Sequence, residues 1–121
     1  MTDKQFRFQD LEIWRRGAEI SQELFRLADR LEDRRLFGFA GQLRSATLSI
    51  TNNIAEGSGS LSKPDFANFL NISRRSVFEV ANILMMLSKD NYLPIADARP
   101  LLAKLEEESR MLLAFRRRLK S

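Results

Sequence analysis

The sequence predicts an all-α protein, folded as an antiparallel up-down-up-down four-helix bundle in a single domain over residues 1–121. Apolar residues recur at three- and four-residue steps in four long segments, which is the period of an amphipathic helix. The chain has only five glycines and three prolines, and several of them lie near the ends of these segments, such as Gly57, Gly59, Pro64 and Pro94. The connections are short, which favours antiparallel neighbours. Strand patterns and internal repeats are absent from the sequence.

The first helix, expected at residues 9–32, carries two neighbouring apolar stripes. The residues of the two stripes are Leu11, Trp14, Ala18, Phe25 and Ala28, and Ile13, Ile20, Leu24, Leu27 and Leu31. A helix that packs into one bundle needs a single stripe. The double stripe therefore predicts an interface with other subunits, formed by Ile13, Trp14, Ile20 and Leu24. The alternative is a helix that is deeply buried within its own chain.

The second helix is expected at residues 36–56. Its core face comprises Leu43, Thr47, Ile50 and Ile54. Gly57 is expected to end this helix just after the C-cap, a position that favours glycine. The run Gly-Ser-Gly-Ser then forms a flexible connection.

The third helix is expected at residues 63–90, because Ser62 is suited to the N-cap and Pro64 and Asp65 to the first turn. Its core face comprises Phe66, Phe69, Leu70, Ser73, Val77, Val80, Leu84 and Leu87. The fourth helix is expected at residues 94–119, where Pro100 predicts a kink or a later start because its ring interrupts helical hydrogen bonding. Its core face comprises Leu101, Leu105, Leu112, Phe115 and Leu119.

The composition excludes several kinds of chemistry. The chain has no cysteine and no histidine, so it has no thiolate nucleophile, imidazole base, disulfide or structural zinc site. Glu106, Glu107 and Glu108 are consecutive and point in different directions on a helix, which predicts a solvated face rather than a metal site. We expect no cofactor and no enzymatic activity. An enzyme would need Glu56 or Glu79 as general acid or base, with Asn53 to orient the substrate.

The N-terminal ten residues mix charged and apolar side chains and lack the apolar core of a signal peptide. No stretch approaches the roughly 20 apolar residues of a membrane span. These two observations predict a cytoplasmic protein that does not bind a membrane.

Polar residues in the middle of the second helix are poor helix formers and need an explanation. They form one stripe, which comprises Gln42, Ser45, Ser49, Asn53 and Glu56. The third helix carries Ser76 and Glu79 three residues apart. If these faces meet, Ser49, Asn53, Glu56, Ser76 and Glu79 form a structural network of hydrogen bonds that fixes the register of the two helices.

The positive charge is unevenly distributed. Residues 1–35 contain eight basic and eight acidic side chains, so the whole net charge of +4 lies in residues 36–121. The candidate nucleic-acid-binding residues are Arg74, Arg75, Arg110, Arg116, Arg117, Arg118 and Lys120. Such clusters attract phosphates, although cations near a helix C-terminus also complement the helix dipole. Most of the nine phenylalanines have core spacing, so no aromatic platform for single strands is evident.

Several motifs resemble a known bacterial family. They are Phe8-Gln9-Asp10-Leu11 with Ile13-Trp14, Gln42-Leu43-Arg44, Ser49-Ile50 followed by Asn53-Ile54-Ala55-Glu56-Gly57, and Phe66, Phe69, Ser76 and Glu79. They are similar to the 23S rRNA intervening sequence proteins, which are related to the accessory variability determinant of diversity-generating retroelements. The resemblance covers nearly the whole chain and departs at Arg75, where the family often has a small residue.

This resemblance implies a left-handed four-helix bundle assembled as a barrel-like homopentamer. It also implies nucleic-acid binding through a basic surface and, in the retroelement branch, association with a reverse transcriptase. We therefore expect a non-enzymatic oligomeric adapter for structured RNA or DNA that acts with a reverse transcriptase or with ribosomal RNA. The alternative is a homo-oligomeric scaffold that binds another protein and no nucleic acid.

Overall fold

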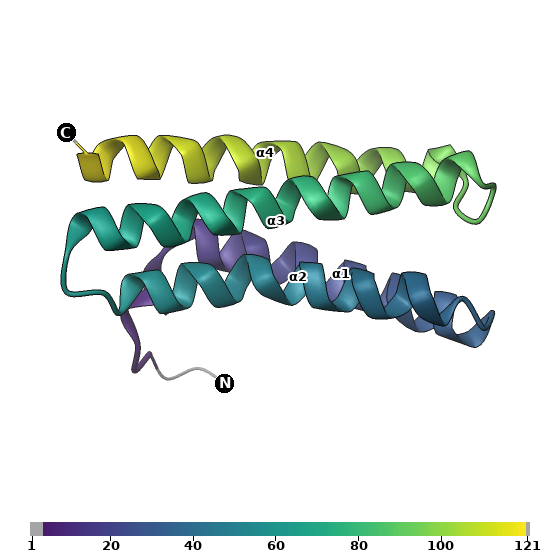
Figure 1. Cartoon of the computed structure of the whole chain (residues 1–121), viewed down its shortest axis with the longest axis horizontal. Coiled ribbons are helices and arrows are strands. Elements are labelled where there is room, and N and C mark those ends of the chain that lie inside the picture. Colours follow the sequence, from purple (N-terminus) through teal and green to yellow (C-terminus); the bar gives the residue numbers. More distant parts are fainter. Residues whose placement is uncertain (1–3, 121) are drawn as a thin grey trace.

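Four long helices lie side by side along one axis (Figure 1). The computed structural model describes residues 4–120 and places α1 at Glu12–Asp33, α2 at Phe37–Ser58, α3 at Lys63–Lys89 and α4 at Ile95–Lys120. A short 3-10 helix, η1, precedes α1 at Arg7–Asp10. The described residues contain no strand, so the prediction of an all-α protein with four helices is confirmed. Residues 1–3 and 121, the ends of the predicted domain, lie outside the described part of the chain.

Each helix packs mainly against its neighbour in the sequence. The contacts between α1 and α2, α2 and α3, and α3 and α4 are extensive, whereas α1 and α4 meet over a smaller area. The side chains between the helices form one apolar core, which includes Leu24, Ile50, Leu70, Leu84 and Leu112. The 3-10 helix η1 and the C-terminal end of α4 lie at the same end of the bundle (Figure 1).

The chain enters α1 later than predicted. Residues 7–10 form η1, and Leu11 is extended, with φ −83° and ψ 127°, before α1 begins at Glu12. This turn brings Phe8 against Trp14, with the ring centroids 5.0 Å apart. The segment before α1 thus covers part of its apolar surface.

The predicted role of Gly57 as a helix terminator is wrong. The α2 helix continues through Gly57 to Ser58, and Gly59 is the C-cap. A Cβ atom at Gly57 would lie 2.7 Å from Cβ of Phe69 and 2.8 Å from Cδ1 of Phe66. Glycine is needed here because α3 approaches the α2 backbone too closely for a side chain.

The ends of α3 follow local sequence signals. The Ser62 hydroxyl accepts a hydrogen bond from the backbone N–H of Asp65 at 3.2 Å and caps the helix. The helix ends at Lys89, and Asn91 then adopts a positive φ of 62°, which asparagine tolerates better than most residues. Pro100 does not delay α4, because this helix begins at Ile95 and includes Pro100.

The structure does not support three of the four residues predicted for a subunit interface on α1. Ile13, Ile20 and Leu24 are buried within the chain itself, and Trp14 is half-buried against the core. The wide apolar face of α1 is covered by α2, by the sparser contact with α4 and by η1. The alternative of a deeply buried helix is therefore the one that the structure supports.

None of the helices in residues 4–120 combines the length and the apolar character that crossing a membrane requires.

Candidate nucleic-acid interface

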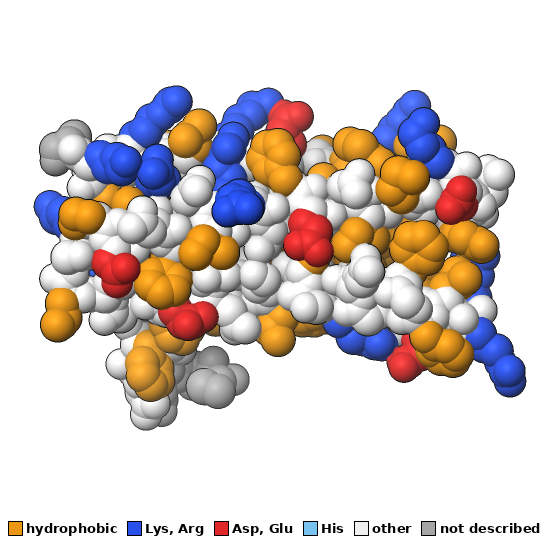
Figure 2. Space-filling model, in the orientation of Figure 1, with side chains coloured by type: hydrophobic (Ala, Val, Ile, Leu, Met, Phe, Trp, Pro, Cys, Tyr) orange, Lys and Arg blue, Asp and Glu red, His pale blue; other side chains and the backbone are white. Residues whose placement is uncertain are grey.

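Two of the basic residues predicted from α3 and α4, Arg74 and Arg116, lie at the contact between these two antiparallel helices, and the other five are exposed. Nε of Arg74 donates to the carbonyl oxygen of Ser109 at 3.1 Å, and Nε of Arg116 donates to that of Ala67 at 3.2 Å. Both arginines thus reach from one helix to the backbone of the other. Figure 2 shows Lys and Arg side chains gathered over α4 and the adjoining part of α3, on the side toward the C-terminus.

Most of these cations have no acidic partner. Arg110 pairs with Glu106 on the same helix. Within residues 4–120, no ion pair involves Arg74, Arg75, Arg116, Arg117 or Lys120. Their positive charge is therefore available to an anionic partner.

Some of the cations on and around α1 are paired with acidic residues. Arg16 contacts Glu12 at 3.0 Å and Glu107 at 2.6 Å, and Arg44 of α2 contacts two acidic residues of α1. Hydrogen bonds from Arg16 and Arg15 hold the pKa of Glu12 below its ordinary value. The charges of Arg16 and Arg44 are thus compensated, whereas Arg26 and Arg30 of α1 form no ion pair within residues 4–120.

The structure adds Arg7 to the basic end of the bundle. Its guanidinium lies 5.2 Å from the ring centroid of Phe66, which in turn packs against Phe115 at 5.5 Å. Arg118 lies 5.2 Å from the Phe115 ring. No sequence signal links Arg7 to these residues, because the contact depends on how η1 folds back onto the bundle.

The predicted polar network is shorter than the sequence suggests. The hydroxyl oxygens of Ser49 and Ser76 are 2.8 Å apart and link α2 to α3. Nδ2 of Asn53 donates to the carbonyl oxygen of Ser49 at 2.8 Å and to its hydroxyl oxygen at 2.9 Å. Glu56 and Glu79 were expected to join, but both are exposed and form no hydrogen bond with other described residues.

A second hydroxyl strengthens the same helix contact. Ser73 is fully buried and donates to the carbonyl oxygen of Ile50 at 2.7 Å. The three residues that do form the network are thus used within the bundle. This leaves the carboxylates of Glu56 and Glu79 on the outer surface of the α2–α3 contact.

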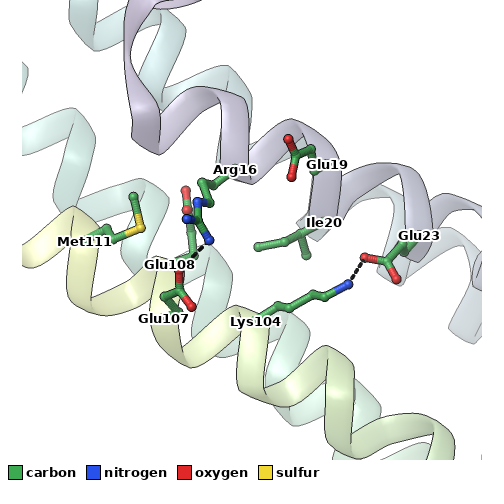
Figure 3. Close-up of a pocket in the computed structure, with 8 residues that line it drawn as sticks. All are labelled: Arg16, Glu19, Ile20, Glu23, Lys104, Glu107, Glu108 and Met111. Atoms are coloured by element: carbon green, nitrogen blue, oxygen red, sulfur yellow. Dashed lines mark hydrogen bonds and ion pairs between the residues drawn. The ribbon is translucent and has the colours of Figure 1, made fainter.

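The prediction of a solvated face at Glu106, Glu107 and Glu108 fails for the third residue. Glu108 is only 1% exposed, and neither of its carboxylate oxygens has a hydrogen-bond partner among the described residues. It lines a cleft of about 80 Å³ between α1 and α4. Figure 3 shows Arg16 in front of the Glu108 carboxylate and paired with Glu107 instead.

Burial raises the pKa of Glu108 to about 8, and the nearby charges of Glu107 and Glu12 act in the same direction against the lowering effect of Arg16. At neutral pH the group is therefore mainly a neutral carboxylic acid. The position of Glu108 has a sequence signal, because it lies three residues after Leu105 and four before Leu112, on the core stripe of α4. No set of three or more acidic residues in the described part of the chain is arranged to hold a metal ion.

Comparison with known proteins identifies the family. No curated protein matches the chain significantly. The model of the family described as 23S rRNA-intervening sequence protein matches residues 9–114. This range takes in α1, α2 and α3 and most of α4. It includes the Ser49–Ser76 contact and, of the predicted basic residues, Arg74, Arg75 and Arg110. The chain therefore belongs to the 23S rRNA-intervening sequence protein family.

Proposed function

We propose that the protein is a non-enzymatic adapter that binds RNA or DNA through the basic residues of α3 and α4. The observation that carries this proposal is the set of cations without acidic partners along these helices. Arginine and lysine contacts to phosphate give binding that is sensitive to salt and largely independent of sequence. The family description, which refers to ribosomal RNA, supports an RNA-related role.

The site geometry supports an adapter rather than an enzyme. Ligand pockets commonly have volumes of about 300–1,000 Å³, whereas the cleft at the buried Glu108 has about 80 Å³. The larger groove between α3 and α4, of about 450 Å³, is open and lined mainly by apolar side chains, with Glu106 as its one acidic lining residue. Asn53, the residue that an enzymatic role would need to orient a substrate, is engaged by Ser49. Ribosomal RNA and a reverse transcriptase are the partners that the family resemblance favours, and both would be met in the cytoplasm.

The adapter would act as a homopentamer, as the family resemblance implies. Five copies of a chain with a net charge of +4 carry +20, and a long polyanion that contacts several copies gains avidity of about 100-fold or more. Since the α1 stripe is buried, another surface must join the copies. The surface that we propose includes Ile72 and Met86, which are exposed and lie 14 residues apart on the same side of α3. Ile72 lies one turn before Ser76.

The test is a gel shift with structured RNA, single-stranded DNA and duplex DNA at physiological ionic strength. The variant replaces Arg116, Arg117 and Arg118 by Gln. We expect weaker binding to all three nucleic acids, because the lost contacts are to phosphates. The matched control replaces Arg26, Arg30 and Arg99 by Gln, which removes the same charge from exposed positions on α1 and at the start of α4. Equal losses in the two variants would show only a general charge effect.

The alternative is a scaffold that binds another protein. The exposed apolar side chains of α3 favour it, since large hydrophobic residues that stay exposed in a chain often mark interaction sites. They are Ile72, Phe78, Met85 and Met86. If the wild-type protein bound none of the three nucleic acids while its assembly stayed intact, the scaffold would be the better explanation.

A further inference from the structure

An open groove of about 450 Å³ lies between α3 and α4. Its walls are mainly apolar, with a few polar groups at fixed positions, as in sites for planar organic ligands. Its lining includes Phe78, Asn82 and Met85 of α3 and Leu102, Glu106 and Ser109 of α4, and the carboxylate of Glu106 is held by Arg110. Figure 2 shows hydrophobic side chains exposed over these helices, next to the cations described above.

The aromatic ring at this groove is available for stacking. Phe78 is 57% exposed, and the guanidinium of Arg74 lies 5.0 Å from its ring centroid. The bond from Arg74 to the Ser109 carbonyl oxygen holds this guanidinium against both helices. An exposed aromatic ring beside a fixed arginine is a surface on which nucleobases stack. The sequence pattern made no aromatic platform evident, and Phe78 is a phenylalanine that the structure leaves exposed.

The polar groups of the groove suit a base edge. Asn82 is exposed, and its side-chain amide forms no hydrogen bond within residues 4–120, so both its donor and its acceptor are free. The Ser109 hydroxyl is already used, since it donates to the carbonyl oxygen of Glu106 at 2.7 Å. Asn82 is thus the residue of the groove that can read the hydrogen-bonding pattern of a base.

The charge around the groove matches a nucleic-acid backbone. Arg74 and Arg75 lie one turn before Phe78 on α3 and form no ion pair within residues 4–120. Arg110 follows Ser109 on α4 but pairs with Glu106, so Arg74 and Arg75 supply the uncompensated charge at the rim. A strand whose base enters the groove would place its phosphates beside these cations. A second copy of the chain or an apolar peptide would have no use for this positive rim, so the charge favours a polyanion as the occupant.

We propose that the α3–α4 groove binds an unstacked base of single-stranded nucleic acid, with Phe78 as the stacking platform and Asn82 as the hydrogen-bonding partner of the base edge. This inference rests on the proposed nucleic-acid binding and gives it a ligand class. The basic residues contact the phosphates of any strand, whereas the groove accepts only a base that is free of its duplex partner.

The experiment compares a single-stranded RNA that contains the fluorescent base 2-aminopurine with a duplex of the same sequence. We expect the fluorescence of the single strand to be quenched on binding to the wild-type protein. Phe78→Ala should weaken binding of the single strand about 5- to 100-fold and abolish the quenching, while duplex binding changes little. Phe78→Trp should retain both effects. The matched control is Phe37→Ala, since Phe37 is 61% exposed at the start of α2.

The outcomes separate this inference from the function on which it rests. If the wild-type protein bound neither strand form, both would fail. If it bound both forms and Phe78→Ala changed neither, or weakened both equally, only the groove inference would be overturned. If Phe78→Ala instead dissociated the assembly, the groove would be occupied by a second copy of the chain, which would also overturn the inference.

Discussion

Gly17 and Glu108 face each other across the contact between α1 and α4. A Cβ atom at Gly17 would lie 3.1 Å from Oε2 of Glu108 and 3.3 Å from Cγ2 of Thr51. Glycine costs about 1 kcal/mol in the interior of a helix relative to alanine. Here it leaves room for a buried carboxyl group at the place where the two helices meet over the smaller area. The consequence is a carboxyl group that titrates in an unusual range.

The stability of the protein should depend on pH through Glu108. Its pKa is raised from 4.5 to about 8, so between these values the folded state holds a proton that the unfolded chain has lost. The free energy of unfolding therefore falls as pH rises from about 4.5 to about 8, and above this window it no longer changes with the titration of Glu108. At pH 7 the unfavourable contribution is about 3 kcal/mol, at 1.36 kcal/mol per pH unit.

Glu108→Gln should remove this dependence and raise the free energy of unfolding at pH 7 by about 2–3 kcal/mol, with little change near pH 4.5. Urea unfolding of the wild type and of Glu108→Gln at pH 5, 7 and 9 gives the free energies of unfolding to be compared. Glu79→Gln is the control, because Glu79 is exposed. Parallel pH profiles for the wild type and Glu108→Gln would contradict the prediction.

Gly57→Ala should destabilise the protein. The new Cβ would lie 2.7 Å from Cβ of Phe69, and such overpacking costs about 1–3 kcal/mol, more than the gain of about 1 kcal/mol in helix propensity. Gly41→Ala in the same helix is the matched control, since no atom lies within 4 Å of its added Cβ. It should raise the melting temperature. A rise in both variants would show that α3 can move away from α2.

The Ser49–Ser76 contact should matter more for stability than the carboxylates beside it. Ser76→Ala leaves the half-buried hydroxyl of Ser49 with one partner fewer, and we expect a loss of about 1 kcal/mol in the free energy of unfolding. Asn53→Ala should cost a similar amount, about 1–2 kcal/mol. Glu56→Gln and Glu79→Gln should leave the melting temperature unchanged, because these side chains lie outside the network. A large loss in either glutamate variant would indicate a contact between subunits.

The proposed assembly can be tested at Ile72. Ile72→Glu should dissociate the pentamer, because a charge buried at an interface without a partner costs several kcal/mol. Since Ile72 is 43% exposed in the chain itself, the fold should tolerate the change. Leu48→Glu, at a 48% exposed position on α2, is the control. Light scattering should give five times 14.0 kDa for the wild type and for this control. A wild-type mass of 14.0 kDa would correspond to a monomer and would contradict the proposed pentamer.

The sequence was sufficient for the elements whose apolar period is regular. On α3, Phe66, Leu70, Val77 and Leu84 repeat at helical spacing, and all four are buried. The helical period alone determines which of these side chains share one face, so the local sequence pattern predicts their burial correctly. The N-cap at Ser62 is equally local, because the cap and its partner are three residues apart.

The features that depend on distant parts of the chain could not be predicted in this way. The double stripe of α1 gives the width of an apolar face but not what covers it, and η1 covers it partly through Phe8. Gly57 has the local signature of a helix end, yet its role is set by Phe66 and Phe69 on the next helix. The spacing of most phenylalanines predicts core positions, so the sequence does not single out Phe78. It lies one position beyond the core residue Val77 and is exposed.

The salt dependence of binding tests whether phosphates are the main ligands. Log affinity should fall linearly with log salt concentration, with a slope of about 0.9 for each neutralised phosphate on duplex DNA and about 0.7 on single strands. Replacing Arg116, Arg117 and Arg118 by Gln should lower this slope by about 2 to 3 on duplex DNA. Phe78→Ala should leave the slope unchanged and lower the single-strand affinity at every salt concentration, because stacking releases no counterions. If the triple replacement left the slope unchanged, the phosphate contacts would not be made by these residues at the end of α4.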